Sequence, residues 1–212
     1  MKWYEEVITK HKLPEALIGE FAGIDGIAVF DNNELPKHRY FLEKRWNAGG
    51  KVLAAMMMNP SAATQVLSDK TVDQLMEVAI ANGCNALHVI NVSSFICGQS
   101  KLISQTHFGF DKINWDFITM VILNSDLVFL GWGVKGQLGM LEQLVGLRKT
   151  VLINALCKLR CYDVLESKNK KIKAALKPLY YVPHPRPIPS TNKYANTAIR
   201  PIKVLELRRL LK

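Results

Sequence analysis

The strongest constraint on the fold is a set of apolar runs that break off at polar or glycine-rich turns. Residues 51–58, 86–92 and 127–130 are mainly apolar, as expected of strands covered on both faces of a sheet. Between them, apolar side chains recur at helical spacing over residues 71–81 and 113–121. Alternating strands and helices form right-handed crossovers, so the sequence predicts a three-layer α/β/α fold with a central, mainly parallel sheet.

The N-terminal part of the chain predicts an addition to this core. Residues 26–30 and 38–46 have strand character and are separated by turn residues, which indicates an N-terminal β-hairpin. No repeat or low-complexity linker divides the chain. We therefore expect a single α/β domain over residues 1–212, with residues 1–47 forming an arm and a hairpin packed on it.

The C-terminal part is harder to interpret. Within residues 138–176, the apolar run at 150–156 fits a helix as well as a strand. Residues 179–182 predict a last strand, because a proline-rich stretch that cannot remain in a sheet interior follows them.

Composition narrows the class of protein. The chain has 28 Lys and Arg against 18 Asp and Glu, a net charge of +10, and such a field favours polyanions, above all nucleic acid. Solubility alone would explain the same charge, but basic residues gather toward the C-terminal part. No apolar run reaches the roughly 18 residues that span a bilayer, and the start lacks a secretory signal. We expect a cytoplasmic protein with a basic face that favours nucleic acid.

The four cysteines give little support to a metal site. Cys84, Cys97, Cys157 and Cys161 lie in or beside apolar segments and form no CxxC pair. Buried, reduced thiols are the simpler interpretation. A Walker loop and a dinucleotide fingerprint are also missing from the sequence. We expect neither a metal nor a cofactor.

Two of the predicted strands end in amide side chains at the sheet edge where ligands bind in folds of this kind. The first ends at Asn59, in a turn that also carries Ser61 and Thr64 and can hold water or an anion. An ordinary turn, in which these side chains satisfy nearby backbone, is equally consistent. The second strand ends at Asn91, whose amide either reads the edge of a ligand such as a nucleobase or pairs with loop backbone.

Aromatic and glycine residues follow the same strand ends. The third strand runs into Gly131, Trp132 and Gly133, where glycines permit close approach of a ligand and the indole offers an aromatic plane. Packing of Trp132 across the end of the sheet is the alternative. Phe95 is a second candidate for stacking on a base, although a phenylalanine after a strand is often part of the core.

A histidine near the C-terminus completes the candidate site. His184 lies between two prolines that hold the chain extended, and Arg186 adds a fixed positive charge. Together they can polarise a carbonyl and clamp a phosphate, whereas a surface or capping histidine is the alternative. Neither a catalytic triad nor paired carboxylates can be assembled, and Asp69 is most simply a helix cap.

Taken together, these motifs resemble the bacterial and phage domain-of-unknown-function family numbered 1643. The resemblance spans about residues 38–190. The matching segments are residues 39–46, 58–64 with Asp69 and Thr71, 89–92, 131–133 and 184–186. That family in turn resembles the uracil-DNA glycosylase superfamily, whose first motif is a strand ending in Asn-Pro or Asp-Pro and whose last is a His-Pro turn.

The resemblance implies a DNA glycosylase, which hydrolyses the N-glycosidic bond between a damaged or modified base and deoxyribose. Asn59 would position the attacking water, Asn91 would bind the flipped base, and His184 would stabilise negative charge on the leaving base. Phe95 and Trp132 would stack on the base. The candidate phosphate contacts are Ser61, Thr64, Lys135, Arg186 and Ser190.

The sequence departs from the superfamily pattern at two positions. Asn59 replaces the aspartate of the most active glycosylases, which implies slow catalysis or a restriction to labile or modified bases. Arg186 replaces a small residue after His-Pro and would either crowd DNA or grip its phosphate. Two other readings stay open, a non-catalytic nucleic-acid or nucleotide-binding module and a hydrolase of small nucleotides.

Overall fold

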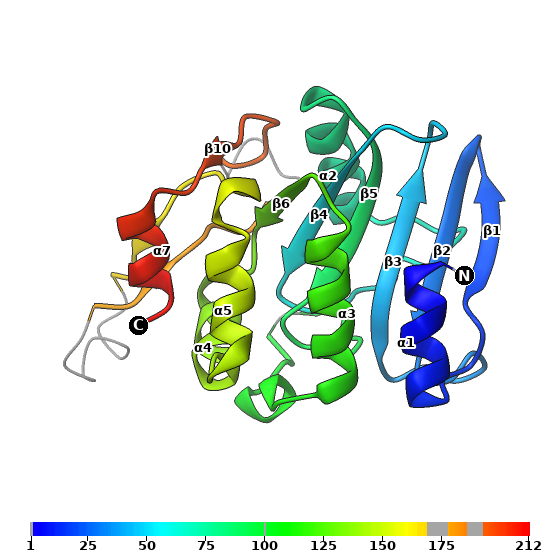
Figure 1. Ribbon diagram of the computed structural model, residues 1–212, viewed down its shortest axis with the longest axis horizontal. Coiled ribbons are helices and arrows are strands. Elements are labelled where there is room, and N and C mark those ends of the chain that lie inside the picture. The colour runs from blue at the N-terminus through cyan, green and yellow to red at the C-terminus, as the bar shows by residue number, and fades with distance from the viewer. Residues whose placement is uncertain (1, 100, 169–177, 186–192) are drawn as a thin grey trace.

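The computed structural model describes residues 2–99, 101–168, 178–185 and 193–212, which form a mixed α/β fold (Figure 1). Eight strands of this described part form one sheet, in the order β1-β2-β3-β5-β4-β6-β7-β10. These strands are β1 (Leu17–Phe21), β2 (Ile24–Phe30), β3 (Arg39–Arg45), β4 (Lys51–Met57), β5 (Cys84–Asn91), β6 (Leu127–Leu130), β7 (Leu159–Cys161) and β10 (Arg200–Pro201). A separate antiparallel pair consists of β8 (Leu165–Glu166) and β9 (Tyr180–Tyr181).

The sheet is parallel at its centre and antiparallel at both ends. β4 pairs in parallel with β5 and β6, and β6 pairs in parallel with β7. β1, β2 and β3 add antiparallel to the β5 side, whereas β10 adds antiparallel to β7. The chain leaves β4 toward β5 and then returns across β4 to β6, so the strand order reverses between β4 and β6. Ligands of open α/β sheets bind at the carboxyl ends of strands near such a reversal.

Helices cover both faces of the sheet, and α2 lies on the face opposite the others (Figure 1). The helices of the described part are α1 (Trp3–His11), α2 (Lys70–Ala81), α3 (Lys112–Leu123), α4 (Gly133–Gln143), α5 (Leu147–Asn154) and α7 (Val204–Leu210), with the 3-10 turns η1 (Gln105–Phe108) and η2 (Leu156–Lys158). The prediction of an α/β fold with helices on both faces of the sheet is confirmed.

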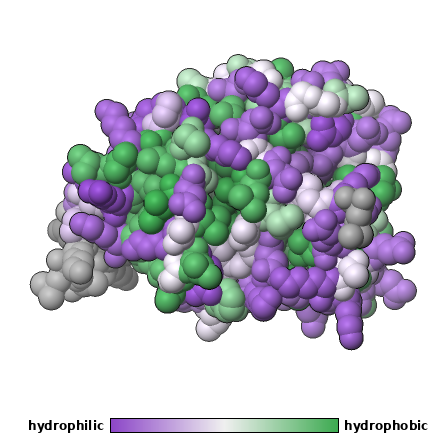
Figure 2. All heavy atoms as spheres, viewed as in Figure 1, coloured by the Kyte–Doolittle hydropathy of each residue, from purple (hydrophilic) through white to green (hydrophobic). Residues whose placement is uncertain are grey.

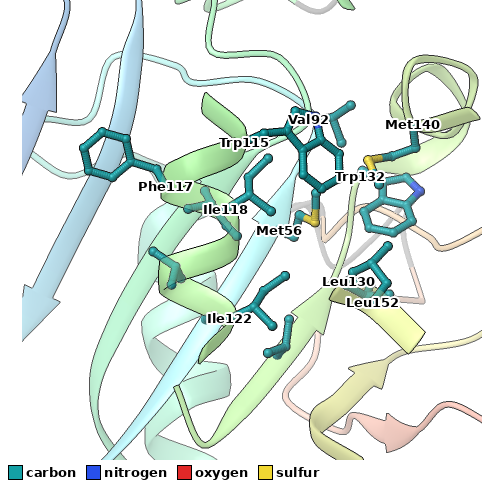
Figure 3. Close-up of a cluster of buried hydrophobic side chains, with 14 of the residues drawn as sticks. Met56, Val92, Trp115, Phe117, Ile118, Ile122, Leu130, Trp132, Met140 and Leu152 are labelled. Carbon is teal, nitrogen blue, oxygen red and sulfur yellow. The ribbon is translucent and has the colours of Figure 1, made fainter. Parts of the chain in front are cut away.

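Two apolar clusters hold the layers together. The larger one joins the sheet to α1, α3, α4, α5 and α7, and Figure 3 shows part of it, with Met56 of β4 near Ile118 of α3 and Leu130 of β6 near Leu152 of α5. The smaller one joins α2 to the other face of β4 and β5. Full burial of each large apolar side chain contributes about 1.5 to 3 kcal/mol, so both layers are firmly attached.

Helix α2 shows how the sequence sets an element that borders the site. Asp69 Oδ1 accepts hydrogen bonds from the backbone N–H groups of Thr71 and Val72 at 2.9 and 3.0 Å, which caps the helix as expected. Leu75 is fully buried against the sheet. Gly83 follows the helix at a φ of +71°, a conformation that glycine adopts without strain.

Several elements differ from the sequence prediction. The prediction contained no helix at α1 and no strand at β1 or β7. β3 pairs with β2, and it also pairs with β5 on its other side, so it lies inside the main sheet and not in a separate hairpin. All but its last residue is buried. The ambiguous residues 150–156 form the end of α5 and then η2. The predicted strand at 179–182 is reduced to β9, which pairs with β8 and not with the main sheet.

Exposed apolar side chains gather on the layer opposite α2. Figure 2 shows them over the part of the molecule where α5 lies, and Leu147 and Ile153 of this helix are 85% and 49% exposed. Within the described ranges, none of the helices combines the length and apolar character needed to cross a membrane.

Candidate functional site

A cavity of about 160 Å³ lies at the carboxyl ends of β4 and β5, beside the first turns of α2. We call it the edge cavity. Its polar lining residues are Arg39, Asn59, Ser61, Thr71, Asn91 and His184, and the rest of its lining is mainly apolar. A dry cavity of about 150 Å³ accommodates a benzene ring, so the edge cavity has room for one planar ring. Asn59, Asn91 and His184, which are far apart in the sequence, all contribute to this one cavity.

The side chain of Asn91 is buried without a hydrogen-bond partner. The residue is 1% exposed, and neither Oδ1 nor Nδ2 is bonded to any described residue. Its backbone is well held, because Asn91 pairs with Met57 of β4 and its carbonyl accepts a hydrogen bond from Asn114 at 2.9 Å. A buried polar group without a partner costs about 1 to 3 kcal/mol. The Asn91 amide therefore offers the edge cavity a donor and an acceptor side by side.

Asn59 is held in one orientation by the backbone around it. Its Nδ2 donates to the carbonyl oxygens of Pro60 and Cys97, both at 2.7 Å. The N–H of Cys97 donates to the carbonyl of Pro60 at 2.9 Å, which joins the turn after β4 to the loop after β5. Since a carboxamide nitrogen carries two hydrogens, both are engaged. Only the acceptor Oδ1 is left to act on a ligand or a water.

His184 reaches the edge cavity from the far end of the chain. Its Nδ1 lies 2.6 Å from the carbonyl oxygen of Pro185. A carbonyl only accepts, so Nδ1 carries the proton in the neutral ring. The N–H of Gly133 donates to the carbonyl of Val182 at 3.0 Å, which fixes the segment before the histidine against the turn after β6.

The glycines of this turn let the histidine segment approach closely. A Cβ on Gly131 would lie 3.1 Å from Pro185 Cδ and 2.5 Å from a ring carbon of Phe129. Gly133 adopts a φ of +69°, and a Cβ there would lie 3.5 Å from the Cβ of His184. The glycines thus make room for another part of the chain, whereas the sequence prediction was close approach of a ligand.

Ser61 and Asp69 stabilise the wall of the cavity next to α2. Ser61 Oγ donates to Asp69 Oδ2, while Oδ1 of Asp69 caps the helix. Thr64 lies outside the cavity lining and closes a turn, where its Oγ1 accepts from the N–H of Leu67 at 3.1 Å. The first free N–H groups of α2 are therefore engaged within the protein, and the ordinary-turn interpretation describes Thr64.

Trp132 lies in the core and does not line the edge cavity. The residue is 1% exposed, and its Nε1 donates to Gln137 Oε1 at 2.9 Å. Its indole packs in the larger apolar cluster, near Met140 (Figure 3). The alternative interpretation, in which this tryptophan packs across the end of the sheet, describes its position.

Phe95 and Lys135 are also placed apart from the cavity lining. Phe95 stacks on His107 with ring centroids 4.3 Å apart. Lys135 Nζ donates to the carbonyl of Ile103 at 3.2 Å. The other two predicted phosphate contacts, Arg186 and Ser190, lie outside the described residues.

Arg39 is the lining residue that the sequence interpretation missed. It is 2% exposed, and its Nη1 donates to the carbonyl of Ala63 at 2.7 Å. Burial lowers the pKa of Arg39 to about 10, and nearby Asp69 opposes part of this effect. The sequence held one signal for this burial. Arg39 begins a strand that continues with apolar Tyr40, Phe41 and Leu42, and such a strand is buried once it pairs on both sides.

The cysteine, histidine and carboxylate side chains of the described residues do not form a metal centre. Cys84 and Cys161 are buried free thiols, and burial raises the pKa of Cys161 to about 12. Cys97 is half-buried and lines the edge cavity, whereas Cys157 is exposed, contrary to the expectation of burial. Among the residues whose structure is described, no three His, Cys, Asp or Glu side chains gather where a metal ion could bind.

The comparison with known families matches residues 39–172 to the family described as Protein of unknown function (DUF1643). The matched segment includes Arg39, Asn59 and Asn91 and ends before His184. Neither the curated proteins nor the solved structures gave a significant match. Because the match covers more than half of the chain, this protein belongs to the DUF1643 family.

Proposed function

We propose that this protein binds a single nucleobase in the edge cavity and hydrolyses the N-glycosidic bond that joins the base to deoxyribose in DNA. The observation that carries the proposal is the buried, unpartnered amide of Asn91 in a cavity of about 160 Å³. An amide in this state pairs with a ring edge that has one donor and one acceptor next to each other. The apolar remainder of the lining suits the faces of such a ring.

The proposed reaction uses groups that the cavity brings together. The bond between C1′ and the base nitrogen breaks, the electron pair leaves with the base, and the water oxygen bonds to C1′. Oδ1 of Asn59 orients this water by accepting one of its hydrogens, since both amide hydrogens are engaged. Protonated His184, with Nδ1 directed at Pro185, donates from Nε2 to the departing base. The attacking water releases one proton to solvent and keeps the other in the new C1′ hydroxyl group, while the hydrogen bond to Asn59 transfers no proton.

The acid–base character of the lining limits the substrates. The described lining contains no Asp or Glu, so Asn59 orients water but does not remove its proton. The proposal therefore favours bases that leave readily, such as damaged or modified ones. The same observation supports a second candidate, a module on this fold that binds a base without cutting the bond.

The test is incubation of the purified protein with DNA duplexes and single strands that carry uracil, alkylated or hypermodified bases. Alkaline cleavage then reports abasic sites. We expect His184→Ala to lower the rate by about 100-fold or more, as the loss of one stabilising donor does elsewhere. Asn59→Ala should also lower it. Asn124→Ala is the matched control. Asn124 Nδ2 also donates a hydrogen bond to a backbone carbonyl, but this residue follows α3 at the surface, away from the edge cavity.

The outcomes separate the candidate functions. Cleavage at the wild-type rate by both Asn59→Ala and His184→Ala would refute the catalytic assignment. Binding that depends on Asn91 without any abasic product would favour the non-catalytic module. Turnover of free nucleosides, with little salt-sensitive binding to DNA, would favour a hydrolase of small nucleotides.

A further inference from the structure

The guanidinium of Arg39 is a buried cation that forms no ion pair with any carboxylate of the described residues. Its Nη1 donates to the carbonyl of Ala63, whereas its Nε is buried and unbonded among the described residues. Asp69 is nearby but forms no ion pair with Arg39. Its oxygens accept hydrogen bonds from Ser61 and from the backbone at the start of α2. A buried charge is costly unless an opposite charge or several hydrogen bonds accompany it.

The edge cavity shares this positive character. Arg39 is the permanent charge of its described lining, which contains no Asp or Glu, and His184 is a second group that becomes positive on protonation. The apolar side chains of Met57 and Leu75 line the same space. A planar ring contacts such side chains favourably, whereas a phosphate does not. The best complement is a ring that carries negative charge.

We propose that Arg39 recognises anionic rings, so that the edge cavity prefers a ring with negative charge to a neutral ring of nearly the same shape. This rests on the proposed assignment of the cavity to a nucleobase. In the proposed reaction, the base departs with the electron pair of the glycosidic bond. Arg39 would then bind the departing base more tightly than the base still joined to sugar, and the substrates would be bases with acidic ring N–H groups.

A purely structural role for Arg39 makes a different prediction. In that case the residue only supports the loop at Ala63, much as Lys44 Nζ donates to the carbonyl of Gln65 at 2.8 Å. Lys44 is 3% exposed and lies on the same strand, but it does not line the edge cavity. Lys44→Met is therefore a matched control for loss of a buried cation that holds this loop.

The test measures the binding of two free rings to the full-length protein by isothermal titration calorimetry. Barbiturate is an anion at neutral pH, and uracil is a neutral ring of nearly the same shape. We expect the wild-type protein to bind barbiturate about ten-fold or more tighter than uracil, as a charge-assisted contact gives. Arg39→Met should bring the ratio close to one, Arg39→Lys should keep part of it, and Lys44→Met should leave it unchanged.

The ratio of two affinities in one sample does not depend on the folded fraction, and the wild-type ratio tests the inference even if Arg39→Met does not fold. Equal affinities in a wild-type protein that produces abasic sites would overturn this inference alone. A charge preference lost in Arg39→Met, without any abasic product, would overturn only the proposed catalysis. No binding of either ring would overturn both. Displacement of barbiturate by inorganic phosphate more readily than by uracil would overturn the preference for a ring.

Discussion

Asn91 and Asn114 are each 1% exposed and lie next to each other, yet their amide groups are in different states. Asn114 Nδ2 donates to the carbonyls of Asn91 and Val92 at 2.9 and 3.3 Å, although its Oδ1 is unbonded among the described residues. The Asn91 side chain makes no bond to any described residue. One asparagine therefore stabilises the fold, while the other destabilises it and is suited to a ligand.

This difference predicts opposite effects of the same substitution. Asn91→Leu should raise the free energy of unfolding by about 1 kcal/mol, because an unbonded buried amide is replaced by an apolar group of similar size. It should also abolish base binding. Asn114→Leu should lower the free energy of unfolding by about 1 to 3 kcal/mol, because it removes bonded donors. Urea denaturation of both variants measures these changes, and a loss of stability in Asn91→Leu would contradict our account of the site.

At the scale of elements, α1 is attached to α3 by one carboxylate. Asp116 of α3 forms ion pairs with Lys10 of α1 at 2.7 Å and with Lys112 at 3.3 Å, and its Oδ2 is hydrogen-bonded to His11 Nε2 of α1 at 2.7 Å. Burial alone would raise the pKa of Asp116, but hydrogen bonds from these three residues outweigh it and lower the pKa from 3.8 to about 2. The polar contacts between α1 and α3 therefore depend on the ionised form of Asp116, in addition to the apolar packing of α1.

The pKa of Asp116 predicts how acid affects stability. A lowered pKa in the folded state stabilises the protein above the unfolded value of 3.8, and this contribution is lost as the pH falls toward 2. We expect Asp116→Asn to lower the free energy of unfolding at pH 6 by an amount on the order of 1 to 2 kcal/mol, after allowance for solvent screening. Near pH 2 the two proteins should be equally stable. Urea titrations across this range check the prediction, and a constant difference at all pH values would refute it.

The turn after β6 predicts a defect in the site from a small substitution. Gly131→Ala should displace the segment that carries His184, because its Cβ would meet both Phe129 and Pro185. We expect the free energy of unfolding to fall by about 1 to 3 kcal/mol, with a loss of base binding. Gly109→Ala is the control, since its Cβ would make only an ordinary contact at 3.6 Å. Calorimetric unfolding and ring binding measure both effects, and wild-type ring binding in Gly131→Ala would exclude this role.

At the scale of the whole molecule, the apolar pattern of the sequence explains the centre of the sheet and not its ends. Residues 51–58, 86–92 and 127–130 became β4, β5 and β6, because a continuous apolar run must be covered on both faces. The three-residue strand β7 is too short to show any period. The parallel centre was predicted from the alternation of strands and helices, but the antiparallel pairing of β3 with β5 and of β10 with β7 was not, because the pattern of a buried strand does not give its direction.

The same limit applied to the candidate site. Strand-end residues could be expected to meet, and Asn59, Asn91 and His184 do line one cavity. The burial of Arg39 was not predicted, because charged residues are rarely buried and the partners of β3 were unknown, so its place at the start of an apolar strand was a weak signal. The sequence alone fits a Trp132 that contacts a ligand as well as one that packs in the core. Its burial and its hydrogen bond to Gln137 show that it belongs to the core.

The net charge of +10 predicts the salt response of DNA binding. Contacts to phosphate release counterions, so affinity for any DNA should fall by about ten-fold or more between about 50 and 200 mM salt. Asn91→Leu should keep the same salt dependence, because Asn91 contacts the base and not the backbone in our proposal. Fluorescence anisotropy with a labelled oligonucleotide tests both points. Affinity that does not change with salt would argue against DNA as the partner.

The walls of the edge cavity come from stretches of chain that the ribosome makes at different times. Arg39, Asn59 and Asn91 are synthesised well before His184, which follows Asn91 by more than 90 residues. A nascent chain can thus assemble β4, β5 and α2 and still lack one wall. In the proposed reaction, the step that needs the imidazole therefore waits until residue 184 has been made and its segment has joined the turn after β6.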